Sequence, residues 1–342
     1  MRLIVVISVT LACSVSFGAP VAPAGPRLEP VTLGVTGRVG MDYLGVEPGS
    51  DRVWAPGGNT GKVFVLDTPT RHVGTVDGFP TADRNGRSIG PGSVAFGRAK
   101  AYVANRGDES LCEVDPATLQ RGSCIHLPAV PDGVVFVEAT QELWVTTPRS
   151  KTITIVALKT GQLASGGMIP LEGRPEGLAV DPAHHRFFTN LEDKDETLEL
   201  DLLTHRVLRR WPTGCGADGP RGLVVTPDAR FLVVACTDAV ETFSLEGSPG
   251  RIDRLEVGAG VDNIDVGGTP LAVFAAAGKA EILTRAALTP DGHLTGPTKL
   301  HSGKGVRTVV VTRSGVAVAA DPVEGRLLLL ATGQPSTPPS PR

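Results

Sequence analysis

The chain has 342 residues, 41% hydrophobic and only 4% aromatic, with a formal net charge of −3 at pH 7. No basic run is interleaved with aromatic residues, which disfavours nucleic acid as a partner because phosphate neutralisation needs clustered Lys and Arg. Glycine (42) and proline (28) are abundant, and no stretch keeps a long helical period. This composition predicts many short strands joined by tight turns in one large all-β domain.

Residues 1–24 have the pattern of a secretory signal peptide. A basic second residue precedes an apolar run, Leu3 to Ala12, that is too short to span a bilayer as a mature helix. Cleavage would follow Ala24 or Gly18, and lipid attachment at Cys13 is the weaker alternative. Without the leader the net charge is −4, from 32 basic and 36 acidic residues. We expect an exported protein, periplasmic or secreted, with no membrane span, that is a monomer.

One pattern of short strands recurs along the chain. Between Arg174 and Leu203, Asp181-Pro182 ends a first strand, and the runs Arg186 to Asn190 and Thr197 to Leu203 follow as two more. Seven copies can be aligned at the residue before the first strand, with spacings of 50, 40, 44, 45, 41 and 45 residues. This period is typical of four-stranded propeller blades. The aligned residues are Asp42, Gly92, Asp132, Glu176, Arg221, Asp262 and Arg307.

The second strand of several units ends in a similar phrase, as in Tyr102 to Asn105, Trp144 to Thr147 and Phe187 to Asn190. The third strand often ends in Asp before a turn. The chain therefore resembles the YVTN family of β-propeller repeats over about residues 30–331, with weaker signatures in the last two units. The resemblance implies a seven-bladed β-propeller. Relatives include surface proteins, exported binding proteins and lactonase-like enzymes, so the function has to be argued from the site.

The two ends of the predicted propeller domain, residues 25–331, are expected to meet. The last unit supplies only three strands, and Glu29 to Gly34 forms an isolated apolar strand near the N-terminus. We predict that this strand completes the last blade, because closure removes two exposed sheet edges. An insertion at Phe79 to Gly90 accounts for the longest spacing. Residues 332–342 are rich in Pro and Ser and predict a disordered tail.

Four cysteines remain after the leader. An even number in an exported chain predicts disulfides, and three pairings are possible. Position along the strands favours Cys112 with Cys124 and Cys215 with Cys236. The alternative, a zinc site, lacks paired CxxC motifs and histidines at ligand spacing, so no metal ligand is assigned.

The candidate site is the mouth of the central channel, where the first strand of every blade would begin. Carboxylates and Asn carbonyls there could hold a hard divalent cation such as calcium, and arginines could hold an anionic group. The alternative is that these charges neutralise one another across a hydrated channel. No other cofactor is assigned. The predicted binding residues are Asp42, Asp132, Glu176, Arg221, Asp262, Asn263 and Arg307, with Asn105, Asn190 and Asp238 further out on the same face.

Function follows less directly. Neither a G-x-S-x-G motif nor a catalytic triad can be recognised, so catalytic residues are not assigned. We expect a binding or interaction scaffold whose partner is a protein, an envelope component or a small molecule at the channel mouth. The alternative is a lactonase-like hydrolase in which a metal held by the mouth carboxylates polarises an ester carbonyl. A cofactor-bearing redox propeller is a third hypothesis. His184-His185 and the acidic run 192–196 are expected to be exposed turns.

Overall fold

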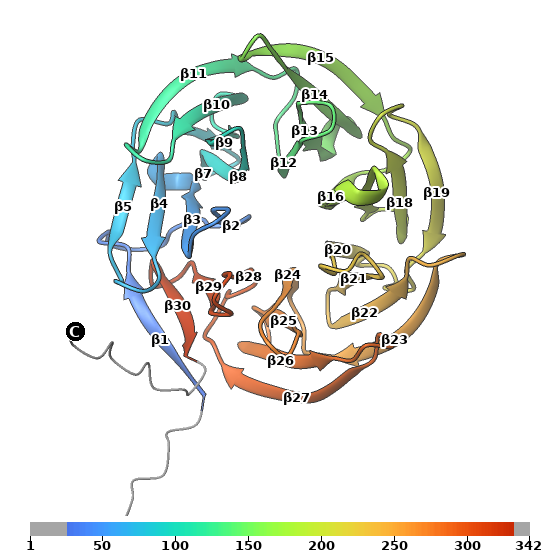
Figure 1. Ribbon diagram of the computed structural model, residues 1–342. Helices are drawn as coiled ribbons and strands as arrows, with labels where there is room; N and C mark the ends of the chain where they lie inside the picture. Colours follow the sequence, from blue (N-terminus) through green and yellow to red (C-terminus); the bar gives the residue numbers. More distant parts are fainter. Residues whose placement is uncertain (1–25, 332–342) are drawn as a thin grey trace, which may run out of the picture.

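The computed structural model describes residues 26–331, so the predicted leader and tail lie outside the described residues. In this range, seven four-stranded antiparallel sheets are arranged in a ring around a central channel (Figure 1). The seven-bladed, all-β propeller predicted from the repeat is therefore confirmed. No helix in the described range is long and apolar enough to cross a membrane.

Each blade is numbered here by its place in the ring, and its strands run from the channel outwards. Blade 1 consists of β2 (Gly45–Val46), β3 (Arg52–Gly57), β4 (Lys62–Asp67) and β5 (Val73–Val76). Blade 2 consists of β8 (Pro91–Gly97), β9 (Lys100–Asn105), β10 (Ser110–Asp115) and β11 (Gln120–His126). Blade 3 consists of β12 (Val134–Val137), β13 (Glu142–Thr147), β14 (Thr152–Lys159) and β15 (Gln162–Pro170). Blade 4 consists of β16 (Pro175–Asp181), β17 (Arg186–Leu191), β18 (Glu196–Asp201) and β19 (Val207–Pro212). Blade 5 consists of β20 (Pro220–Val225), β21 (Phe231–Cys236), β22 (Ala239–Ser244) and β23 (Gly250–Glu256). Blade 6 consists of β24 (Val261–Gly267), β25 (Ala272–Ala277), β26 (Ile282–Leu288) and β27 (Leu294–His301). Blade 7 consists of β28 (Val309–Val311), β29 (Ala317–Asp321), β30 (Arg326–Ala331) and β1 (Arg27–Thr32). Between residues 26 and 331, three single-turn 3₁₀ helices occupy connections: η1 (Gly58–Thr60), η2 (Pro148–Ser150) and η3 (Pro182–His184).

The ring closes as the sequence predicts. Strand β1 pairs antiparallel with β30, from Arg27 opposite Ala331 to Thr32 opposite Arg326. The N-terminal segment thus becomes the outer strand of blade 7, and the first and last parts of the chain share one sheet (Figure 1). Strand β1 begins and ends two residues before the predicted strand, Glu29 to Gly34.

The hydrophobic core is divided into seven layers, each between two neighbouring blades. Between blades 7 and 1, for example, Phe64 and Leu66 pack with Val318, Leu327 and Leu329. Each such side chain contributes roughly 1.5–3 kcal/mol through burial. The three tryptophans also lie in these layers and not on the surface: Trp54, Trp144 and Trp211.

The repeat signatures have structural causes. The Asp that ends a third strand accepts hydrogen bonds from backbone N–H groups of the following turn, as in Asp67 with Thr70 and Asp201 with Thr204. These are Asx-type turns, which fix the reversal of the chain. They lie on the face opposite the mouth, so they stabilise the blades without contributing to the candidate site.

Both disulfides form as predicted from position. Cys112 and Cys124 lie opposite each other on β10 and β11 with an S–S distance of 2.03 Å. Cys215, which precedes β20, bonds to Cys236 at the end of β21 with an S–S distance of 2.06 Å. The second bond ties a loop on the mouth face to its blade.

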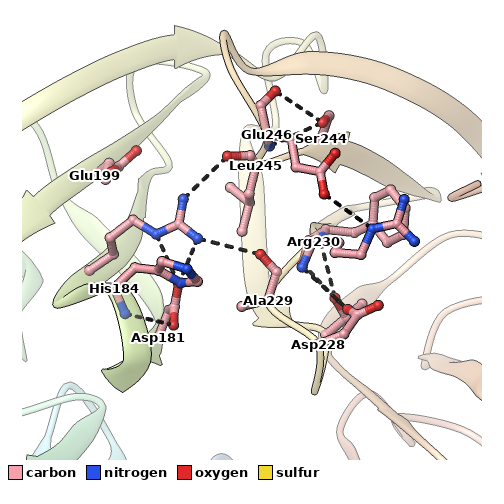
Figure 2. Close-up of polar contacts among 12 residues, drawn as sticks. Asp181, His184, Glu199, Asp228, Ala229, Arg230, Ser244, Leu245 and Glu246 are labelled. Carbon is pink, nitrogen blue, oxygen red and sulfur yellow. Dashed lines mark hydrogen bonds and ion pairs between the residues drawn. The ribbon is translucent and has the colours of Figure 1, made fainter.

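On the opposite face, a buried ion pair joins blades 4 and 5. Arg186 donates from Nε and Nη2 to Asp181, at 2.9 and 2.6 Å, and reaches the carbonyl oxygens of Leu245 and Ala229 in the next blade. His184 lies against the same carboxylate, with Nδ1 2.8 Å from it (Figure 2). This turn histidine therefore supports an inter-blade contact, whereas His185 takes the left-handed conformation that ends η3.

The insertion forms a small hairpin, β6 (Ala82–Arg84) and β7 (Arg87–Ile89). It packs against η1 on the mouth face, and Arg84 anchors it to blade 2 through an ion pair with Glu109 (2.5 Å). The hairpin consequently forms one wall of the channel mouth.

Candidate ligand site at the channel mouth

The inner strands place one end of every blade at the mouth. Strands β2, β8, β12, β16, β20, β24 and β28 surround the channel (Figure 1). In four of them the pairing register shifts at the mouth end, as between Glu176 and Ala179 in β16. Such irregularities re-aim side chains, and they occur where the predicted ring residues lie.

Two arginines connect three of the ring carboxylates. Arg106 donates to Asp42 at 2.6 Å and also pairs with Asp132. Arg307 lies 3.2 Å from Asp42 and 3.1 Å from Asp262. The chain of ion pairs Asp132–Arg106–Asp42–Arg307–Asp262 thus follows the mouth around five consecutive blades, and it links the first blade to the last.

Tyr43 extends this network to the fourth carboxylate. Its hydroxyl lies 3.0 Å from Asp132 Oδ2 and 3.3 Å from Glu176 Oε1, and it accepts a hydrogen bond from the N–H of Gly177 at 3.2 Å. A hydroxyl has one proton to donate, so it serves one carboxylate at a time. Among the described residues, no Lys, Arg or His lies within 4.0 Å of Glu176, which is the one ring acid without a cationic partner.

The environments drive the pKa values of these acids apart. Burial raises the pKa of Asp42, but the charges of Arg106 and Arg307 outweigh it, and the net pKa is lowered. Burial and the neighbouring carboxylates Asp132, Asp262 and Asp42 raise the pKa of Glu176 well above its usual value. Burial also raises the pKa of Asp132, and that of Asp262 to about 7 in spite of Arg307. Groups perturbed in this way cluster at functional sites more often than elsewhere.

Burial and the same carboxylates raise the pKa of Tyr43 well above 10. The phenol therefore stays protonated and acts as a hydrogen-bond donor at neutral pH.

Three predicted residues have other roles. Arg221 pairs with Glu192 at 2.5 Å, outside the central network. Asn105 and Asn190 are fully buried, and their amides donate to Asp108 in the following turn and to the Arg221 carbonyl of the next blade respectively, so their side chains are structural.

The remaining two predicted residues lie apart from the network. Asp238 is exposed and pairs with Arg254 at 3.2 Å. Asn263 faces a chamber of about 240 Å³ inside the channel, and its Nδ2 has no hydrogen-bond partner in the described structure. Thr308, 1% exposed, lines the same chamber with an unpaired hydroxyl.

Two cavities open at the mouth on either side of Arg307 and Arg38. One has a volume of about 330 Å³ and is bounded by the β6–β7 hairpin, with charged lining residues Arg38, Asp42, Arg87, Arg106 and Arg307. The other has a volume of about 570 Å³, with charged lining residues Arg38, Arg221, Asp262, Lys279, Glu281, Lys304 and Arg307. The floor of the mouth thus consists of carboxylates that are paired with arginines, and its rim is lined mainly by basic side chains.

The divalent cation stays a prediction. In residues 26–331 the only three His, Cys, Asp or Glu side chains whose ligand atoms lie within 4.8 Å of one another are Cys215, Cys236 and Glu241, and the two cysteines are disulfide-bonded. The ring carboxylates therefore do not come together as a three-acid ligand set in this conformation.

Sequence reasoning missed Arg106 and Tyr43, which make the network. Each follows a predicted position directly, Arg106 after Asn105 and Tyr43 after Asp42. A signal was available at Gly92, the one ring position without a side chain, because space left there has to be filled from a neighbouring loop. Lys279, Lys304 and Arg38 were also missed, since they lie in connections with no repeat signature.

No protein-family model matches the chain, and no curated protein matches it. Solved structures do. Kuenenia stuttgartiensis hydrazine synthase aligns with a TM-score of 0.73 and 14% identity over 87% of this chain and 97% of that one. The Cps50 (Swd1) β-propeller domain of Myceliophteria thermophila aligns with a TM-score of 0.72 and 11% identity over 90% and 99%. Streptogramin B lyase aligns with a TM-score of 0.71 and 12% identity over 90% and 97%. At these identities the similarity establishes the β-propeller fold alone.

Proposed function

We propose that the protein is an exported binding propeller that takes a small ligand at its channel mouth. The observation that carries this proposal is the pair of cavities that meet at Arg307, over a floor in which Arg106 and Arg307 form ion pairs with Asp42, Asp132 and Asp262. A closed ring of seven blades holds these groups in fixed positions, and preorganised polar groups bind without a large ordering cost.

Export is part of the proposal. It is supported by the leader-like N-terminal sequence and by the two disulfides, which persist mainly in oxidising compartments. The YVTN resemblance is compatible with it, because exported binding proteins occur among such relatives.

Native mass spectrometry of the protein purified from the exported fraction tests the proposal. We expect a small molecule that stays bound in the native spectrum and is lost on denaturation. Arg307→Ala would remove the residue shared by both cavities and reduce the ligand-bound fraction, whereas Arg206→Ala, on the opposite face, would not. A ligand-free mass in protein from the exported fraction, with nothing regained from an extract of the same fraction, would contradict the proposal.

One observation favours a second candidate, an enzyme that transfers a proton at Glu176. The raised pKa of Glu176 and the lowered pKa of Asp42 are the type of divergence that separates a general acid from a permanent anion. Lactones are the first substrates to test. If Glu176→Gln and Asp132→Asn left lactone turnover at the wild-type level, these residues would not be catalytic.

A further inference from the structure

The rim of the mouth is strongly basic although the chain as a whole is acidic. The charged residues that line the two cavities include seven cations and three anions, against a net charge of −3 for the chain. The excess of positive charge is therefore a property of this surface and does not follow from the overall composition of the chain. A concentration of one sign of charge around a concave site favours ligands of the opposite sign.

The cations form two groups with different tasks. Arg106, Arg221 and Arg307 hold carboxylates of the protein. The other four are exposed and have no carboxylate within 4.0 Å in the described structure: Arg38, Arg87, Lys279 and Lys304. These four are free to meet an anion from solution.

Arg307 connects the two groups. Its guanidinium is fixed from below by Asp42 and Asp262, yet 46% of its side chain is exposed. A guanidinium carries five N–H donors, so the two protein carboxylates do not exhaust it. An oxyanion placed above Arg307 would meet a donor group that is already oriented, with Lys279 and Lys304 lining the same cavity.

Glycines allow the loops around this cavity to approach one another closely. Gly260, Gly278 and Gly305 line the larger cavity. A Cβ added to Gly260, whose φ is +91°, would lie 2.5 Å from the backbone nitrogen of Lys279, and one added to Gly278 would lie 3.0 Å from the carbonyl carbon of Gly305. Side chains at the first two positions would meet the backbone of the facing loop, so glycine there lets the loops that carry Lys279 and Lys304 lie close together beside the cavity.

We propose that this cavity binds a small polyanion, with carboxylate or phosphate oxygens held by Lys279, Lys304 and the outer edge of Arg307. The inference rests on the proposed function and names the chemical class of its ligand. Asp42 and Asp262 then position Arg307, and because Asp262 and Glu281 also line the cavity, the anionic groups of the ligand have to lie toward the two lysines. The volume of about 570 Å³ suits a small molecule with two or three charged groups.

Isothermal titration calorimetry at low salt tests the proposal, with citrate and pyrophosphate as separate probes for the carboxylate and phosphate classes. The double variant Lys279→Gln/Lys304→Gln removes two rim charges. The matched control Lys159→Gln/Arg206→Gln removes two exposed charges from the opposite face. Thermal unfolding of each variant verifies that the propeller is intact.

We expect saturable binding of at least one probe to the wild-type protein, weakened about tenfold in the rim variant and unchanged in the control. Salt should weaken it further by screening. The proposal is overturned if neither probe binds, if the rim variant binds as tightly as the wild type, or if the control loses as much. A neutral or cationic ligand found by native mass spectrometry would also overturn it, while leaving the broader binding function standing.

Discussion

Arg106 occupies the space that Gly92 leaves open at the channel mouth. A Cβ built on Gly92 would lie 2.9 Å from Nε and 3.1 Å from Cζ of Arg106. Blade 2 thus contributes a cation to the mouth from the end of its second strand. Several other blades instead contribute a charged side chain from the start of their first strand. The guanidinium reaches Asp42 and Asp132 only because the ring position beside it is glycine.

Gly92→Ala should therefore destabilise the protein by about 1–2 kcal/mol, since the added methyl group displaces a pinned guanidinium. Chemical denaturation measures the change. Gly250→Ala is the control, because a Cβ there meets nothing within 4 Å and the backbone is not left-handed. Equal effects of the two substitutions would show that Arg106 is not held at Gly92.

Arg106→Gln should cost roughly 3 kcal/mol of folding free energy at neutral pH, because it leaves Asp42 and Asp132 without their shared cation. The pKa of Asp42 is lowered in the folded protein, so its contribution is present above the ordinary value of 3.8 and is lost as the pH falls below it. The difference between wild type and variant should shrink on acidification. A difference that grows toward acid pH would contradict the assignment.

Arg186→Met should destabilise the junction of blades 4 and 5 by roughly 3–5 kcal/mol, because Asp181 is almost fully buried and would lose its cation. Burial raises the pKa of Asp181, but hydrogen bonds from Arg186 and His184 outweigh it and the net pKa is lowered. This stabilisation is therefore lost as the pH falls below about 4. The double variant Asp181→Asn/Arg186→Met should recover part of the loss in urea denaturation, and additive losses would argue against the pair.

Glu176→Gln should flatten the pH dependence of stability. The pKa of Glu176 is raised in the folded protein, so the wild type loses about 1.4 kcal/mol per pH unit as the pH rises from 4.5 toward the raised value. The glutamine variant lacks this loss and should equal or exceed the wild type in stability above neutral pH. The exposed Glu138→Gln is the control for denaturation series from about pH 5 to about pH 9, and parallel slopes for all three proteins would refute the raised pKa.

The repeat made the architecture predictable because it fixes strand number, strand order and the end at which each blade begins. Position along that repeat also gave both disulfides, since Cys112 and Cys124 fall opposite each other once the turn at Asp115 is placed. The closing strand followed from a missing fourth strand in the last unit.

The candidate site was predictable only in outline. Alignment placed Asp42, Asp132, Glu176, Asp262 and Arg307 at one mouth, but pairings between blades depend on side-chain reach, which a period does not encode. Arg106 and Tyr43 were therefore not predicted from the sequence. The basic rim was not predicted either, because Lys279 and Lys304 lie in two connections without a repeat signature that meet through the hydrogen bond from Gly305 N–H to Gly278 O.

The most direct measurement is a crystal structure of the protein purified at low salt from its exported fraction. The account predicts electron density for a bound molecule above Arg307, with charged groups toward Lys279 and Lys304. A mouth that holds only ordered water, with a bound molecule or partner on another face, would contradict it.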